Sequence, residues 1–562
     1  MIDRKPRSNF IDLFLLLVFL SPFFVAESVA AQEGDESVVR VFIFAGQSNM
    51  VGSHSNASEI AKYPRYVGLD QPEAGVGFRY CIGRGNKTIA DQWVPLHPVN
   101  NIFGPELSFA RKIAAETDGK IAIIKVAAGG THLGGDWNPD VPQDYKLYPL
   151  ALEFVKEALA DLEEQGMKYR LEGFMWHQGE NDMFDQKYKK KYGANLKNFI
   201  ACWRHDLDCP DLNFYIGELC TKTVWGMDLR DSMYAISVGQ KQVAAEDDRV
   251  QYVPTSHNSV RVGKETGLHY HYGTLGQLQH GECYAKAYLD SIGVKAEPRK
   301  ELEKWPYPAG SKVKLFVMAG HRNMEGERAF VQELAENQTG ESLLRPNEKI
   351  AFKYSIGGGY KVSNGWESLG PAGFYGTFGP ELSFAASFAK TNREPIAIAK
   401  FTHSGSQMVD WTPAGSNAKS RNLFPDFIKF VKESVTELES KGNEVEIAGI
   451  VYHVGENDMA YGPFRKQSSD HLKVLIDQSR IELDLPELKW FVSQQPPTNK
   501  KGVNEIDVTS KIATIADEDQ FTTHVKVFDL KGREQEQVIS TWGIVQLGEK
   551  LAAAVTNSKP KR

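Results

Sequence analysis

The chain has 562 residues, which is too long for a single hydrophobic core and predicts about two to four domains. With 41% hydrophobic and 24% charged residues, it has the composition of an ordinary globular protein. Its formal net charge of −7 offers no basic surface for nucleic acid or for an anionic membrane, so we expect neither as a partner.

The first 31 residues have the order of a secretory signal peptide. Basic residues precede an apolar run from Phe10 to about Val25, and small residues follow it. We predict cleavage near Ala30 or Ala31, which makes the mature protein secreted or periplasmic. An N-terminal membrane anchor is the alternative, because the apolar run is close to the upper length of a signal core. No later segment is long and apolar enough to span a bilayer.

Export would place the protein where disulfides can form. The chain has five cysteines, so at least one of them stays free. Cys202 and Cys209 are close in sequence and could bridge, and their spacing is not that of a structural zinc site.

The stretch from Val38 to Gly52, VVRVFIFAGQSNMVG, predicts a buried strand followed by a sharp turn, because its first part is apolar on both faces. Ser48 follows the strand at once, where open parallel sheets place their ligands. The small residues around it would let the turn expose the hydroxyl, which favours a nucleophile. The alternative is a serine that caps a helix N-terminus.

The sequence contains a tandem duplication. Four segments recur in the same order at offsets of 274 to 276 residues, which is a whole domain and far longer than a solenoid repeat. The pairs are VRVFIFAGQSNMVG with VKLFVMAGHRNMEG, two copies of FGPELSFA, IAIIKVAAGG with IAIAKFTHSG, and GFMWHQGENDM with GIVYHVGENDM. We therefore predict a first domain at 37–295, a charged, proline-containing linker at 296–310 and a second copy at 311–557.

Short apolar strands alternate with amphipathic helices in the first copy. This alternation predicts an α/β fold with a mainly parallel sheet and helices on both faces. The expected strands are Ile121–Val126, Gly173–Trp176, Phe214–Ile216 and Val250–Val253, and the expected helices are Glu106–Glu116, Pro149–Glu164, Lys187–Arg204 and Leu275–Ser291.

The duplication provides an internal control for the chemistry. A residue needed for the fold should survive in both copies, whereas one needed only for a reaction can be lost from one of them. Ser48 is replaced by Arg322, while the neighbouring Asn49 is retained as Asn323. Because arginine is neither a nucleophile nor a capping residue, the replacement favours a chemical role for Ser48.

A serine nucleophile needs a base, and histidines at the end of the first copy are the candidates. The segment GLHYHYGTLGQLQHG carries His269, His271 and His280, whereas the corresponding segment of the second copy has no histidine. The alternatives are a surface histidine or a His-x-His metal pair, for which the sequence offers no third ligand.

The acid that would orient this base is less evident. Glu218 follows the predicted strand in LNFYIGELC, and its counterpart is Gln494, which has nearly the same shape and no charge. A solvated glutamate without a catalytic role is the alternative.

The oxyanion donors are expected in two segments. GGTHLGGDW offers the backbone N–H of Gly130, and WHQGEND offers the amide of Gln178. Gln178 becomes Val454, so the second copy loses this donor, whereas Asn181 is kept as Asn457. Asn181 could still donate, but its persistence favours a structural role for that loop.

Taken together, these segments resemble the SGNH (GDSL-like) hydrolase superfamily and, within it, the sialate O-acetylesterase and carbohydrate esterase family 6 group. The matching pieces are AGQSNM, KVAAGGTHL, WHQGEND and HYGTLGQLQHG, spread over residues 38–291. The resemblance implies two tandem three-layer α/β/α domains of flavodoxin-like type, and hydrolysis of acetyl esters on sugars without metal or organic cofactor. It also implies Ser48 as nucleophile, and Gly130 with Gln178 or Asn181 as oxyanion donors.

Alignment on the residues that follow makes His271 the family base, with His269 as the alternative. The sequence departs from the family at the acid, because many members carry Asp three residues before the histidine and this chain has Leu268 there. Some members instead take the acid from a Gly-Glu-Leu segment, which here contains Glu218. A second departure is His132, where relatives often have serine, and this change bears on substrate choice.

The sequence therefore predicts a carboxylic ester hydrolase that acts on an acetylated carbohydrate, either sialic acid or a polysaccharide. The second copy is expected to be inactive, as a sugar-binding or packing domain. Two other interpretations stay open: a glycan-binding protein in which both copies are inactive, and a transferase that differs only in its acceptor.

Overall fold

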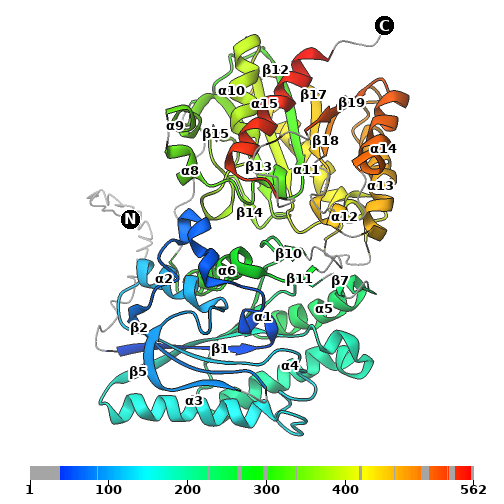
Figure 1. Cartoon of the computed structure of the whole chain (residues 1–562). Coiled ribbons are helices and arrows are strands. Elements are labelled where there is room, and N and C mark those ends of the chain that lie inside the picture. Colours follow the sequence, from blue (N-terminus) through cyan, green and yellow to red (C-terminus); the bar gives the residue numbers. More distant parts are fainter. Residues whose placement is uncertain are drawn as a thin grey trace, which may run out of the picture. The chain divides into compact units, whose positions relative to one another are not determined.

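The computed structural model of the chain describes residues 38–558, apart from 85–86, 222, 225–226, 263–268, 295–301, 303, 337, 417–420, 461, 495–504, 528–529 and 531–537. Two large, mainly parallel sheets organise these residues, and helices flank each of them (Figure 1). The prediction of two tandem α/β units is thereby confirmed. The predicted signal peptide and most of the predicted linker lie outside the described residues, and the domain boundaries stay a prediction.

The first sheet has seven strands, and all neighbouring pairs are parallel except the edge pair of β2 and β3. Strand β1 lies in the middle, and it is buried from its second residue onward because it is apolar on both faces. The order across the sheet is β3 (Thr88–Leu96), β2 (Glu73–Ile82), β4 (Ile121–Ala127), β1 (Val38–Gly46), β5 (Lys168–His177), β6 (Phe214–Gly217) and β9 (Val250–Val253).

Helices cover both faces of this sheet and make three layers. Helices α2 (Glu106–Glu116) and α6 (Gly273–Ser291) share one buried cluster with Phe42 and Phe44 of β1. Helices α3 (Leu147–Glu164), α4 (Gln186–Asp206) and α5 (Arg230–Glu246) share the other with Val41 and Ile43. The shorter elements are α1 (Ser48–Val51), η1 (Ala57–Lys62), η2 (Pro64–Tyr66), η3 (Asp182–Phe184) and a small sheet of β10 (Arg261–Val262), β11 (His269–His271), β7 (Thr223–Val224) and β8 (Met227–Asp228).

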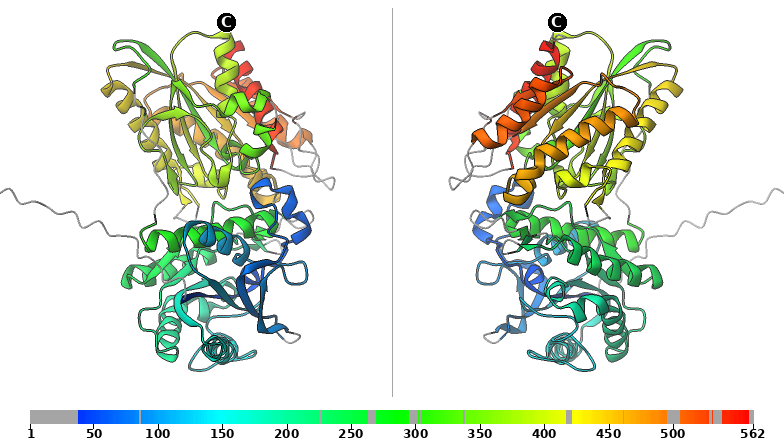
Figure 2. Two further views of the ribbon diagram at one scale, coloured as in Figure 1. Left: turned by 90° about the vertical axis from the view of Figure 1, so that its left-hand side faces the viewer. Right: turned by 90° about the vertical axis from the view of Figure 1, so that its right-hand side faces the viewer.

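The second sheet repeats the strand order of the first, with β12 in the place of β1, and helices again lie on both faces (Figure 2). Its path is β14 (Lys361–Val362), β13 (Asn347–Ile356), β16 (Ile396–Thr402), β12 (Lys312–Gly320), β17 (Glu444–His453), β18 (Trp490–Gln494) and β19 (Thr522–Lys526), and β15 (Glu367–Leu369) pairs with β13. The helices are α7 (Arg322–Glu325), α8 (Val331–Ala335), α9 (Gln338–Leu344), η4 (Phe374–Gly376), α10 (Glu381–Thr391), η5 (Met408–Trp411), α11 (Phe424–Ser440), α12 (Glu456–Ala460), α13 (Gly462–Glu482), α14 (Glu505–Glu518) and α15 (Thr541–Asn557).

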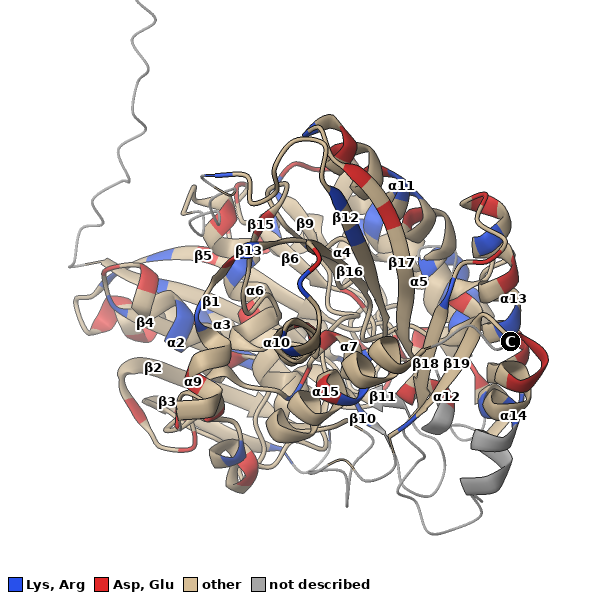
Figure 3. Cartoon of the chain, turned by 90° about the horizontal axis from the view of Figure 1, so that it is seen from above, with Lys and Arg blue, Asp and Glu red and all other residues tan. Residues whose placement is uncertain are grey.

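The surface agrees with the nearly balanced composition. Acidic and basic residues are interspersed along helices such as α11 and α13 (Figure 3). Within the described residues, no helix is both long and apolar enough to cross a lipid bilayer. All five cysteines are unbridged, including Cys202 and Cys209.

Candidate active site

A tight turn at the end of β1 presents Ser48. Gly46 has φ of +151°, and a Cβ there would lie 2.1 Å from the carbonyl oxygen of His177 at the end of β5, so only glycine fits. Helix α1 begins directly at Ser48 and is capped by Gly52, which has a left-handed conformation and donates its backbone N–H to the carbonyl of Ser48. The turn leaves Ser48 partly exposed at the carboxyl edge of the sheet, as predicted from the sequence.

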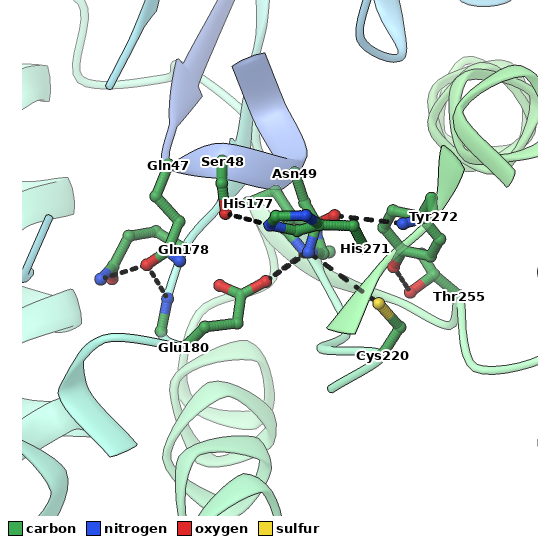
Figure 4. A network of polar contacts seen from close by, with 12 residues as sticks. Gln47, Ser48, Asn49, His177, Gln178, Glu180, Cys220, Thr255, His271 and Tyr272 are labelled. Atoms are coloured by element: carbon green, nitrogen blue, oxygen red, sulfur yellow. Dashed lines mark hydrogen bonds and ion pairs between the residues drawn. The ribbon is translucent and has the colours of Figure 1, made fainter. Parts of the chain in front are cut away.

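His271 comes from β11 and meets Ser48 at this edge. Its Nε2 lies 3.0 Å from Ser48 Oγ, although the two residues are far apart in the sequence (Figure 4). The imidazole is 7% exposed. The structure thus brings together the predicted nucleophile and the predicted base, while the side chain of the alternative, His269, lies outside the described part of the chain.

Burial keeps the His271 imidazole neutral. Burial and, to a smaller extent, the neighbouring His54 lower the pKa of His271 to about 3, against a still smaller opposite effect of Glu180. At neutral pH the ring therefore has one bare nitrogen. When Nε2 is the nitrogen without a proton, its lone pair faces the hydroxyl of Ser48 and can accept the hydroxyl proton.

His54 contacts the opposite side of the His271 ring. The two Nδ1 atoms are 2.9 Å apart, and the rings meet edge to face with centroids 4.6 Å apart. We assign the proton to Nδ1 of His271 and the accepting lone pair to His54, because Nε2 of His271 must be bare to accept from Ser48. Burial and the charge of Arg261 lower the pKa of His54, which suits a neutral acceptor. The sequence analysis missed this residue, and no motif or spacing marks it.

Glu218, the predicted acid, has other partners. Its carboxylate accepts hydrogen bonds from the backbone N–H groups of Thr255 and Ser256, at 3.1 and 3.0 Å, and lies 3.5 Å from the guanidinium of Arg421. Burial alone would raise the pKa of Glu218, but Arg421 and these N–H groups hold it below its usual value. Among the described residues Glu218 makes no hydrogen bond or ion pair with His271, so the geometry gives the predicted role no support.

Asn49, next to the nucleophile, ties Ser48 to the segment that carries His271. Its side-chain amide donates to Glu180 at 2.6 Å, and its side-chain oxygen accepts from the backbone N–H of Tyr272 at 3.3 Å (Figure 4). Burial would raise the pKa of Glu180, but His177 and Asn49 outweigh it and the pKa is lowered. An ionised Glu180 therefore anchors Asn49 and, through it, the position of the base.

Gly129 lies beside the nucleophile, and Gly130 follows it in the chain. A Cβ on Gly129 would lie 3.6 Å from Cβ of Ser48, and Gly130 has φ of +71°. Gln178, in contrast, is fully buried, and its amide donates to the Thr131 carbonyl at 2.8 Å and to Asp182 at 2.6 Å. These bonds use both of its N–H groups, so in this conformation Gln178 fixes the loop around Gly130.

Asn181 is the other predicted donor. It is partly exposed, and among the described residues no group forms a hydrogen bond with its side-chain amide. The neighbouring Asp182 is buried and accepts from the backbone N–H groups of Leu133 and Gly134, which accounts for its persistence in both repeats. Asp458 makes the corresponding bond to Met408 N in the second repeat.

A family model described as carbohydrate esterase, sialic acid-specific acetylesterase, matches residues 38–290 and again residues 312–557. The chain belongs to this family. Both repeats therefore derive from the fold of this family.

Individual proteins are also similar to parts of this chain. A probable carbohydrate esterase of Arabidopsis thaliana is 30% identical over 189 residues, which are 31% of this chain and 66% of the relative, just under two thirds of its length. A solved A. thaliana structure covers 45% of this chain and 98% of its own, at 20% identity and a TM-score of 0.34. A carbohydrate acetylesterase structure from Xanthomonas citri covers 44% of this chain and 56% of its own, at 16% identity and a TM-score of 0.33.

The second repeat keeps the family fold but fills the place of the nucleophile. Arg322, the counterpart of Ser48, is 1% exposed, forms an ion pair with Glu327 and donates from Nε to the side-chain oxygen of Asn457 at 2.8 Å. Asn457 is the counterpart of Asn181. The side-chain oxygen of Asn457 thus meets the guanidinium of Arg322, while its amide donates to the backbone carbonyls of Ser404 and Ser406 at 2.9 and 2.8 Å.

One buried carboxyl differs in ionisation between the two repeats. Glu456 corresponds to Glu180, but burial raises the pKa of Glu456 to about 8, in spite of the nearby Arg322. The stabilisation by protonated Glu456 is complete below its unfolded pKa of about 4.5 and is lost as the pH rises toward 8. We therefore expect Glu456→Gln to melt at a higher temperature than the wild type at pH 8.5, with the difference disappearing toward pH 4.5.

Glu180→Gln is the matched control for this expectation. Because the pKa of Glu180 is lowered, its ionised form stabilises the fold above pH 4.5, and the glutamine variant should melt below the wild type there. Thermal unfolding followed by calorimetry between pH 4.5 and 8.5 measures both. Parallel pH profiles for Glu456→Gln and the wild type would contradict the assignment.

Proposed function

We propose that the first repeat is a serine O-acetylesterase that removes acetyl groups from sialic acid or from a polysaccharide. The observation that carries the proposal is the approach of His271 Nε2 to within 3.0 Å of Ser48 Oγ. A neutral imidazole at this distance can take the hydroxyl proton as the oxygen attacks a carbonyl carbon. The carbohydrate is inferred from membership of the family, and sialic acid is one candidate because the family is described as sialic acid-specific.

Acylation begins when Ser48 Oγ attacks the acetyl carbonyl while its proton passes to His271 Nε2. The protonated imidazole then gives this proton to the sugar oxygen, which leaves as an alcohol, and the acetyl group stays on Ser48. In the second half His271 takes a proton from water, the hydroxide oxygen attacks the acetyl carbon, and acetate leaves as Ser48 regains its proton.

The negative charge of the tetrahedral intermediate needs N–H donors close to Ser48. We assign them to the backbone N–H of Gly130 and the side-chain amide of Asn181. Asn181 is preferred to Gln178 because the Gln178 amide already donates to Thr131 and Asp182, whereas no described residue forms a hydrogen bond with the Asn181 amide. One such donor is typically worth about 10²–10³ in turnover.

The second repeat and the N-terminal segment complete the proposal. Arg322 cannot act as a nucleophile, so we assign all catalysis to the first repeat. The signal-like order of residues 1–31 places this activity in a secreted or periplasmic protein.

Covalent labelling tests the proposal directly. A fluorophosphonate should add to Ser48 of the full chain, with the mass increase on the peptide that contains AGQSNM and none on the peptide that contains AGHRNM of the second repeat. His271→Ala should abolish labelling, because the hydroxyl loses its base. A folded protein that binds acetylated glycan but takes up no label would indicate the non-catalytic alternative.

A further inference from the structure

A polar cavity of about 490 Å³ opens beside the proposed oxyanion glycine. Its volume falls in the range of small-ligand sites and suffices for a single sugar ring. The lining residues are Arg84, Gly130, His132, Asp136, Asp144 and Tyr145.

The cavity adjoins the reaction centre through two consecutive glycines. Gly129 lies against Ser48, as described above, and a Cβ on Gly130 would lie 3.3 Å from a guanidinium nitrogen of Arg84. An acetyl group held at Ser48 therefore has its sugar within reach of this guanidinium.

Arg84 is an exposed side chain on the loop after β2, and the Tyr145 ring holds it in place. The guanidinium carbon lies 5.3 Å from the centroid of that ring. Among the described residues, no carboxylate forms an ion pair with Arg84. Its planar fork of N–H donors suits bidentate binding of a carboxylate or sulfate group.

His132 supplies a second cation in the same cavity. Its Nδ1 lies 3.5 Å from Asp136, and this contact, with smaller effects of Asp182 and Asp185, raises the pKa of His132 against the effect of its own burial. The Tyr188 ring packs against the imidazole, with the two ring centroids 5.3 Å apart. Protonated His132 is therefore more populated near neutral pH than an ordinary histidine would be.

Two carboxylates also line the cavity, and they differ in accessibility. Asp136 is 1% exposed and accepts from the backbone N–H groups of His132 and Tyr145, at 2.8 and 3.2 Å, so its charge is compensated within the loop. Asp144 is exposed at the rim and opposes an anionic ligand. The net charge around a ligand beside Gly130 thus depends on the positive charges of Arg84 and protonated His132 and on the negative charge of Asp144.

We propose that this cavity binds an anionic group, a carboxylate or a sulfate ester, on the sugar that carries the acetyl ester. The proposal rests on the proposed function and selects acidic over neutral glycans as substrates. Arg84 binds the anion directly, and protonated His132 adds a second contact that weakens as the pH rises through its pKa. His132 is then, with Arg84, a determinant of substrate charge.

Matched substrates test the proposal. An O-acetylated uronic acid glycoside, its neutral pyranoside counterpart and a sulfated pyranoside, acetylated at the same position, are compared on the full chain by kcat/KM. The wild type should prefer at least one acidic substrate, and whichever it prefers identifies carboxylate or sulfate as the anion. In Arg84→Gln the ratio of kcat/KM for that substrate to kcat/KM for the neutral one should fall about tenfold or more.

Three further variants test whether the preference for the acidic substrate follows the charges in the cavity. Asp144→Asn should raise the same ratio, because it removes an opposing charge. His132→Gln should lower the ratio at pH 6 more than at pH 8. Lys87→Gln, which removes a cation from the same loop outside the cavity, should leave the ratio as in the wild type.

The outcomes separate this inference from the proposed function. If Arg84→Gln lowers kcat/KM equally for all three esters, Arg84 acts on the reacting carbonyl or on the fold, and the anion subsite is refuted. If no ester is hydrolysed at all, the proposed function fails, and calorimetric binding of the deacetylated uronic acid and sulfated glycosides decides the subsite. Binding of either one that is lost in Arg84→Gln supports the subsite, and no binding to the wild type overturns it.

Discussion

Replacing Ser48 by alanine is expected to lower kcat/KM for an acetyl ester by about 10⁴-fold or more. The hydroxyl forms the covalent bond to the acetyl group, so no other part of the site can take over its step, and only the activity due to binding and oxyanion donors should remain. Hydrolysis of 4-nitrophenyl acetate and of an acetylated sugar measures the loss. Ser48 is partly exposed and its backbone N–H and C=O remain, so the fold should survive the change.

Ser53→Ala is the matched control for this experiment. It removes a hydroxyl from the same turn, where the backbone N–H of Ser53 bonds to the carbonyl of Ser48, and it should keep the activity of the wild type. Thermal melting of both variants shows whether either change affects the fold. An activity of Ser48→Ala within tenfold of the wild type would end the acyl-enzyme mechanism.

The elements that the sequence predicted well are those with strong periodicity. Helix α2 and strand β9 have the predicted bounds, and the other predicted elements differ from the observed ones mainly at their ends. The hairpin of β2 and β3 was not predicted, because half-exposed β3 contains Asp91, Gln92 and Pro95 and lacks an apolar face. Helix α5 was also missed, since polar Ser237 and Gln240 are buried in it and interrupt the apolar stripe.

The predicted nucleophile and base meet because both lie at the edge of the sheet where the carboxyl ends of the parallel strands come together. Ser48 follows the central strand, and a group of three histidines lies before or on the last helix of the repeat, so both could be placed near this edge from the sequence. The choice of His271 among the three came from the resemblance to a known family. Glu218 lies at the same edge, but the direction of its carboxylate depends on Thr255, Ser256 and Arg421, which are distant in the sequence. Edge position can be read from a sequence, whereas the choice among competing partners cannot.

His54 could not be predicted for a related reason. Its role depends on a backbone φ of +66°, which is uncommon for residues other than glycine and turns the imidazole toward His271. A histidine in a short polar turn gives no such signal. The structure shows which hydrogen bond it makes, and the chemistry of that bond can be tested.

Replacing His54 by alanine is expected to lower kcat/KM by about 10²-fold. The imidazole of His271 would lose the acceptor that holds its proton on Nδ1, and the tautomer with Nε2 protonated cannot accept from Ser48. His54→Asn is the matched control, because its side-chain oxygen occupies the same position along the side chain as Nδ1 of histidine and is also a neutral acceptor. It should stay within about threefold of the wild type, whereas a purely steric role of the ring would make asparagine as damaging as alanine.

His54→Asp separates orientation of the base from its charge. Aspartate tolerates positive φ, and its oxygen also takes the place of Nδ1. A carboxylate there should raise the pKa of His271 by about 1–3 units, because it stabilises the imidazolium. In the wild type kcat/KM should stay constant from pH 7 down to about 4, since protonation of His271 inactivates it only near its pKa of about 3.

The aspartate variant should move this acid limb to higher pH and make His271 a stronger base, with a larger kcat at pH 8. The pH profiles of kcat/KM for the wild type, His54→Asn and His54→Asp measure both effects. Coincident acid limbs in all three would show that residue 54 does not interact with the base during catalysis. An acid limb of the pH profile that moves only in the aspartate variant would establish that residue 54 interacts with the base. In the wild type this partner would then be a neutral acceptor, in the place where other serine hydrolases use a carboxylate.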